Sequence, residues 1–142
     1  MIDKNYLYRY SSLLSIISDH IMDTLDIPGM DPDKPEKVIP YLNRFKECYN
    51  NLSKIHQYLR SLESPLPEIA YYHSELVDAV KVFVDGVEEV VKSVKVNQKP
   101  PDISISLDPD RLNEGFARKE QGKDLVFLAT GKINQRLMEL GY

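Results

Sequence analysis

Residues Leu66–Val96, with the sequence LPEIAYYHSELVDAVKVFVDGVEEVVKSVKV, decide the predicted fold. Apolar residues recur in this stretch at steps of three or four, which is the spacing of one face of an α-helix. The residues on this face are Ile69, Tyr72, Leu76, Val80, Phe83, Val87, Val90, Val91 and Val94. A helix of about thirty residues is roughly 45 Å long. So long an apolar face needs packing partners along its whole length, and we expect the other segments to supply them.

Two further helices are predicted before this stretch, over residues 3–26 and 40–62. Both segments carry apolar residues at the same helical spacing. Asp3 is a suitable N-cap for the first helix, because its side chain can accept hydrogen bonds from free backbone N–H groups. Ile27-Pro28-Gly29 is expected to end that helix, since proline disfavours helix in the residue before it.

The connections around the second helix contain many prolines. Residues 27–40 hold four of them, and we place Pro40 at the first helical position, where its missing N–H costs nothing. The sequence Ser64-Pro65-Leu66-Pro67 predicts a tight reversal, so the helices on either side of it should be antiparallel neighbours.

A fourth helix is predicted after residue 108, because Asp108-Pro109 combines an N-cap with a proline at the first helical position. Residues 103–107 alternate apolar and polar side chains, which is a strand pattern without a partner in this chain. We read them as part of a Pro-rich extended crossover, with strand pairing to another molecule as the alternative. Residues 124–129 have strand propensity, but helical spacing continues to Leu140. A break or kink is expected near Gly122.

The predicted fold class is therefore all-α. We expect residues 1–142 to form a single domain, an up-and-down four-helix bundle with an extended crossover before a kinked last helix. No disulfide is possible within the chain, because Cys48 is its only cysteine.

Composition limits the function. The net charge is −4, and binding a nucleic-acid backbone requires a basic face, so we expect no nucleic-acid partner. No stretch approaches 18 uninterrupted apolar residues, which argues against a membrane span. The N-terminus does not have the pattern of a secretory signal. The expected location is the cytoplasm, although a domain cut from a longer secreted precursor would look the same.

His56 and His73 are the candidates for a metal or ligand site. Each lies on the apolar face of its predicted helix, and the antiparallel arrangement should bring both to one end of the bundle. Helical bundles do build such sites from facing side chains. However, the sequence contains no Glu-x-x-His or His-x-x-x-His pattern. We therefore favour the interpretation that both histidines are neutral core residues with hydrogen-bond partners, and we expect no cofactor.

Tyr8, Tyr58, Tyr71 and Val82 are the candidates for a partner-binding surface, since they point away from the predicted core faces. Tyrosine offers a large contact area at a low entropic cost and is common in interfaces. Scattered exposed apolar residues are also normal on monomers. No catalytic set is recognisable, so we expect not an enzyme but an interaction or regulatory module. Its partner would be another protein or a second copy forming a homodimer. A ligand- or metal-binding bundle is the alternative function.

Overall fold

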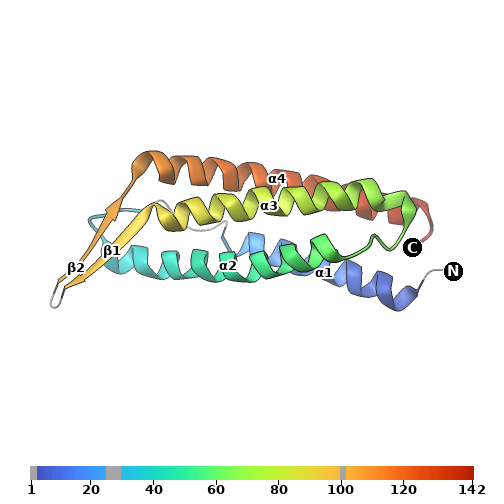
Figure 1. The fold of residues 1–142 in the computed structure, drawn as a ribbon, viewed down its shortest axis with the longest axis horizontal. Helices are drawn as coiled ribbons and strands as arrows, with labels where there is room; N and C mark the ends of the chain where they lie inside the picture. The colour runs from blue at the N-terminus through green and yellow to red at the C-terminus, as the bar shows by residue number, and fades with distance from the viewer. Residues whose placement is uncertain (1–2, 25–29, 100–101) are drawn as a thin grey trace.

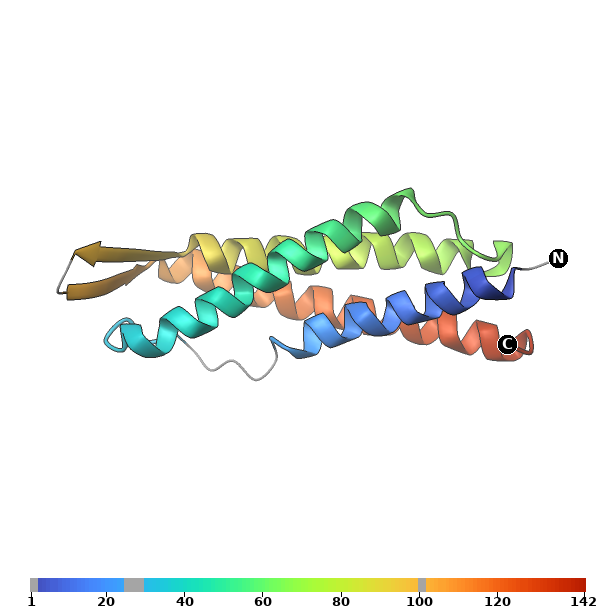
Figure 2. The same cartoon turned by 90° about the horizontal axis from the view of Figure 1, so that it is seen from below.

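The computed structural model describes residues 3–24, 30–99 and 102–142, which form four long helices and a two-stranded sheet (Figure 1). Successive long helices run in opposite directions (Figures 1 and 2). The prediction of a mostly helical chain with four long helices is confirmed. None of the described helices has the length and apolar content that crossing a membrane requires. The elements in chain order are α1 (Lys4–Met22), α2 (Pro35–Ser61), the short 3-10 helix η1 (Pro67–Ile69), α3 (Ala70–Lys92), β1 (Val94–Lys99), β2 (Asp102–Leu107) and α4 (Pro109–Glu139).

The valine-rich face of α3 lies at the centre of the core, as predicted. Val80, Phe83, Val87 and Val90 are all buried, and α3 packs against both α2 and α4. Burying a side chain of this size stabilises the fold by about 1.5–3 kcal/mol. The core also includes buried side chains from α1, α2, α4 and the sheet, so this one face organises the described chain.

α3 and α4 pack closely against each other, and glycines make this possible. A Cβ at Gly122 would lie 2.5 Å from the Cα of Phe83, and a Cβ at Gly86 would lie 2.7 Å from the Cα of Lys119. Gly115 is equally confined, because its Cβ would lie 2.8 Å from the backbone nitrogen of Val90. The predicted break near Gly122 is wrong: α4 continues through this residue. The helix cost of the glycines is about 1 kcal/mol each, and close packing against α3 offsets it.

The predicted crossover is also wrong, because residues 102–107 do have a partner in this chain. β2 pairs with β1 in an antiparallel hairpin, with Val94 opposite Leu107 and Val96 opposite Ile105. The predicted third helix was therefore too long, and its last valines belong to a strand. Alternation of Val94, Lys95 and Val96 fits a strand as well as a helix, and only the pairing with residues 102–107 decides between them. The hairpin extends beyond the helices at one end of the molecule (Figure 1).

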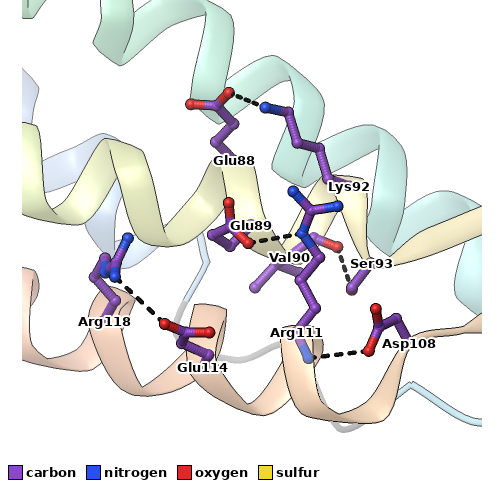
Figure 3. Close-up of polar contacts among 9 residues, drawn as sticks. All are labelled: Glu88, Glu89, Val90, Lys92, Ser93, Asp108, Arg111, Glu114 and Arg118. Carbon is purple, nitrogen blue, oxygen red and sulfur yellow. Dashed lines mark hydrogen bonds and ion pairs between the residues drawn. The ribbon is translucent and has the colours of Figure 1, made fainter.

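Polar contacts hold the base of this hairpin where α3 ends and α4 begins (Figure 3). The Arg111 guanidinium donates to Glu89 at 2.7 Å, which links α4 to α3. The backbone N–H of Asp108 donates to the carbonyl oxygen of Ser93 at 2.8 Å. The Asp108 side chain also accepts from the Arg111 backbone N–H, as the predicted N-cap should. These bonds fix the register in which α3 and α4 meet.

Two helix boundaries differ from the sequence expectation. α1 ends at Met22, earlier than predicted, and the expected stop at 27–29 lies outside the described residues. α2 begins at Pro35. A proline at the start of the helix was expected, but the predicted one was Pro40. Pro40 lies in the second turn of α2, where its missing N–H removes one backbone hydrogen bond.

Candidate functional site

The predicted surface tyrosines lie at the end of the molecule opposite the hairpin, where α1 and α3 begin and α2 ends (Figure 1). Tyr8, Tyr58 and Tyr71 are all exposed, whereas Val82 is half-buried. The three tyrosines do not form one patch. Tyr58 lines a hollow between α1 and α2, and Tyr71 packs edge-on against Tyr72. Only Tyr8 borders a sizeable apolar groove.

This groove lies between α1 and the C-terminal part of α4 and has a volume of about 500 Å³. Tyr8 and Met138 are both 74% exposed on its two sides. Among the described residues that line it, Lys4 is the only charged one. The groove therefore offers mainly apolar contacts. The described residues that line it are Lys4, Leu7, Tyr8, Ser11, Asn134, Leu137, Met138 and Tyr142. We call this the α1–α4 groove.

Local structure at the start of α1 explains why Tyr8 points outward. The Asp3 carboxylate caps the helix by accepting from the Asn5 N–H at 2.9 Å. Tyr6 donates its hydroxyl to the backbone oxygen of Glu63, and Tyr10 is buried in the core. Tyr8 is two residues from both, which places it about 200° further around the helix and away from the core. The positions of Tyr6 and Tyr10 therefore determine that the Tyr8 side chain points away from the core.

The C-terminal end of α4 positions Tyr142 over the other side of the groove. Gly141 has φ +89°, a left-handed conformation that glycine adopts without steric cost. The Gly141 N–H donates to the oxygen of Met138, and the Tyr142 N–H donates to the oxygen of Leu137. This pair of bonds is a Schellman motif, in which the residue after the glycine turns back against the helix. Tyr142 therefore joins Leu137 and Met138 in the lining.

Towards the middle of the molecule the groove continues as a polar depression of about 300 Å³. Its α1 wall consists largely of small residues, among them Ser11, Ser15 and Ser18, and Thr130 and Asn134 face it from α4. Short side chains do not fill the space between two helices, so α1 and α4 stay apart here. The space between α1 and α4 is therefore apolar at its outer end and polar towards the middle of the molecule.

His73 is buried and fully hydrogen-bonded. Its Nδ1 lies 2.7 Å from the Tyr10 hydroxyl, and its Nε2 lies 3.1 Å from the carbonyl oxygen of Leu62. A carbonyl can only accept, so Nε2 carries the proton and Tyr10 donates to Nδ1. Burial lowers the pKa of His73 below its ordinary value, which favours the neutral ring. A metal or ligand at either ring nitrogen would have to displace the partner bonded there.

His56 has separate surroundings from His73. Burial lowers the pKa of His56, and the cations Lys81 and Arg60 lower it further. Lys81 lies about two helical turns beyond His73 along α3. Within the ranges that the structure describes, no group of three or more His, Cys, Asp or Glu side chains is placed to hold a metal ion.

Two reactive side chains are sequestered in the core rather than in the groove. Cys48 is buried, and desolvation raises the pKa of its thiol to about 12. Such a thiol is a poor nucleophile at neutral pH, since the thiolate is the reactive form. The Lys119 ammonium lies 5.9 Å from the ring centre of Phe45, which is a cation–π contact. Burial lowers the pKa of Lys119. Both residues fill space between helices.

Sequence reasoning missed Met138 and Tyr142, two of the main groove residues. Met138 lies between Leu137 and Leu140, which we assigned to the core face, and no pattern marked it as special. Tyr142 follows Gly141 directly after the last helical residues. A glycine just past a helix is a known stop signal, and it could have indicated that the next side chain turns back onto α4.

Comparison with protein families, curated proteins and solved structures finds no match to this chain. The function must therefore be argued from the residues and their arrangement.

Proposed function

We propose that this chain is a non-enzymatic interaction module, built as an up-and-down four-helix bundle, that binds a protein partner through the α1–α4 groove. The observation that carries the proposal is the juxtaposition of Tyr8 and Met138, two large side chains that are each 74% exposed beside one apolar groove. Apolar groups that remain in water across a groove gain free energy when a partner covers them.

The shape of the seam favours a helical segment as the bound part of the partner. Two roughly antiparallel helices with small residues between them form a trough, and an amphipathic helix can lay its apolar face into such a groove. Leu137, Met138 and Tyr142 line the groove. Their side chains would contact apolar side chains at successive turns of that helix. Tyrosine and methionine suit this role, because both adapt to apolar surfaces of different shape.

An enzymatic role has less support from the arrangement of reactive groups. Two reactive side chains, His73 and Cys48, have shifted pKa values, and both are buried. Neither faces the α1–α4 groove. The alternative of a metal- or ligand-binding bundle also has less support, since both ring nitrogens of His73 have partners within the chain. Metal analysis of untagged protein, with His56→Ala and His73→Ala as variants, tests that alternative.

Site-specific photo-crosslinking in cells tests the proposal. A photoreactive phenylalanine analogue is placed at Tyr8 or at Met138, with the same analogue at Tyr71 as the matched control. Tyr71 is 71% exposed but lies outside the groove. We expect the two groove positions to give the same discrete crosslinked product, identified by mass spectrometry, and the control to give none. Failure of both groove positions to crosslink any protein, or identical products from all three positions, would contradict the proposal.

A further inference from the structure

His73 connects α1 to the rest of the bundle through a buried hydrogen bond. The Tyr10 hydroxyl donates to one ring nitrogen at 2.7 Å, and the other nitrogen donates to the carbonyl oxygen of Leu62, at the end of α2, at 3.1 Å. The imidazole therefore lies between α1 and α2 and contacts both. His73 is 8% exposed and Tyr10 only 2%, so bulk water cannot replace a bond that is lost inside this contact.

Protonation of the ring affects its two hydrogen bonds differently. A protonated imidazole carries a hydrogen on each nitrogen. Nε2 donates to Leu62 in both protonation states, so the contact with α2 survives. Nδ1 changes from an acceptor to a donor, and the Tyr10 hydroxyl can no longer donate to it. Within the described chain this hydroxyl has no other acceptor, and a buried O–H without a partner costs free energy. A proton on His73 therefore disfavours the contact with α1 specifically.

The other contacts of α1 are fewer than those between α3 and α4. A depression of about 300 Å³, lined largely by serines on its α1 side, separates α1 from α4. The polar links at the two ends of α1 use backbone oxygens: Tyr6 donates to the oxygen of Glu63, and Arg44 donates to the oxygen of Asp23. Because α3 and α4 pack closely through their own glycines, α1 can open locally while these two helices stay together.

The elements around the imidazole bring few charged groups to it. The titratable side chains in this region are Tyr6, Arg9 and Tyr10 from α1, Glu63 after α2, Glu75 from α3 and Lys132 from α4. Burial raises the pKa of Tyr6 and of Tyr10, so both phenols stay protonated in acid. Glu75 and Lys132 pair with each other at 3.7 Å.

None of these charged side chains is a cause of the pKa of His73. Burial lowers this pKa below 6.5, against the carbonyl oxygens of Leu62 and Leu59, which raise it. When α1 detaches, water reaches the ring and its pKa returns towards the ordinary value. The open state then binds the proton more readily, so opening is linked to proton uptake. The closed state is favoured in full above pH 6.5, and this advantage is lost as the pH falls through the folded pKa.

We propose that His73 is a proton-operated switch that detaches α1 from α3 in mild acid and so takes apart the α1–α4 groove. This inference rests on the proposed function, because it makes binding through that groove depend on pH. Leu7 and Tyr8 line the groove from α1, and Leu137 and Met138 line it from α4. A partner that contacts both sides would lose one of them when α1 leaves, so acid should release it.

Native-state hydrogen exchange at about pH 7 and about pH 5.5 tests the switch in wild-type protein. An imidazole titrates within this interval, whereas most carboxylates titrate below it. After correction for the intrinsic effect of pH on exchange, the opening constant of amides in the middle of α1 should rise about fivefold at the lower pH, since opening takes up one proton. An opening constant for α1 that does not respond to pH would overturn the inference.

Two glutamine variants identify the titrating group. His73→Gln keeps a group that can accept from Tyr10 and donate to Leu62 but cannot be protonated, so the response of α1 to pH should fall below about twofold. His56→Gln is the matched control. The charged groups that shift the pKa of His56 all belong to α2 and α3, so detachment of α1 leaves them in place. This variant should retain the wild-type response, and an equal loss in both variants would contradict the switch.

Solution NMR tests the same step without a substitution. The ring signals of His73, Tyr10 and Tyr8 in wild-type protein should change in one common transition below pH 6.5, because proton uptake and detachment of α1 are coupled. A titration of His73 that leaves the Tyr10 ring unaffected would contradict this coupling.

The switch and the proposed function fail in different ways. If Tyr8 and Met138 crosslink to a protein in cells but the opening of α1 is independent of pH, the proposed function stands and the switch is excluded. If α1 opens in acid as expected but neither position crosslinks, His73 still controls α1, and the role of the groove in binding is excluded.

Discussion

The contacts of α4 with α3 and with α1 differ in the residues that lie between the helices. Against α3, the glycines Gly86, Gly115 and Gly122 allow backbone to approach backbone. Against α1, the serines Ser11 and Ser18 and their neighbours leave a depression open to solvent. The first seam is closed along its length, whereas the second presents the groove. Small residues therefore let two helices pack without a gap only where the two backbones approach each other closely.

The largest expected effect comes from filling the closed seam. Gly122→Ala places a methyl group 2.5 Å from the Cα of Phe83, and the atom in the way is backbone that cannot rotate aside. We expect a loss of about 3 kcal/mol or more in the free energy of unfolding, measured by chemical denaturation. Gly131→Ala is the matched control, because a Cβ there would meet no atom within 4 Å, and it should stabilise by up to about 1 kcal/mol. Equal effects of the two substitutions would show that the approach of Phe83 does not confine residue 122.

A smaller effect is expected at the contact that joins α1 to α3. His73→Gln removes a buried ring bonded to Tyr10 and Leu62, and we expect a loss of about 1–2 kcal/mol near neutral pH.

The pH dependence sharpens this test. The folded-state pKa of His73 is lowered from 6.5 by burial, so the unfolded chain binds the proton more readily. The stability is present above pH 6.5 and is lost as the pH falls through the folded pKa. The His73→Gln variant should therefore have a flatter dependence of unfolding free energy on pH below 6.5. His56→Gln should also flatten this dependence, because burial and the cations Lys81 and Arg60 lower the pKa of His56 as well, so each variant is compared with the wild type. An unchanged slope in His73→Gln would contradict the burial of a neutral ring.

The smallest effect is expected at the end of the groove. Gly141→Ala forces a side chain into the left-handed conformation seen at φ +89°, at a cost of about 1 kcal/mol. Tyr142 should then leave its position beside Leu137, which solution NMR of the tyrosine ring would detect. Gly141→Asn should retain most of the wild-type behaviour, because asparagine tolerates this conformation. A Tyr142 environment unaffected by alanine would mean that the Schellman motif does not position it.

The sequence predicted the elements that depend on local pattern, and it failed where distant residues decide. The periodic face of α3 was enough to place Val80 and Phe83 in the core. Gly122 was misread as a break, since its benefit comes from Phe83 on another helix. Val94 was assigned to a helix because its strand partner, Leu107, is thirteen residues away.

The candidate site was predicted only in part for the same reason. Tyr8 was identified because its direction follows from the helical period of one segment. Tyr58 and Tyr71 were grouped with it, but which exposed residues share a surface depends on how helices pack, and only Tyr8 borders the groove. Met138 and Tyr142 required knowledge of which face of α4 meets α1. A single sequence contains no direct record of that contact.

Native-state hydrogen exchange of the wild-type protein tests the difference between the two seams most directly. The backbones of α3 and α4 approach each other closely at the glycines, whereas α1 is attached to α3 through side-chain contacts such as the bond between Tyr10 and His73. We predict that amides in the middle of α1 exchange through a local opening of lower free energy than global unfolding. Amides of α3 and α4 around Gly86 and Gly122 should exchange only when the whole chain unfolds. Equal protection of α1 and α4 would contradict the account.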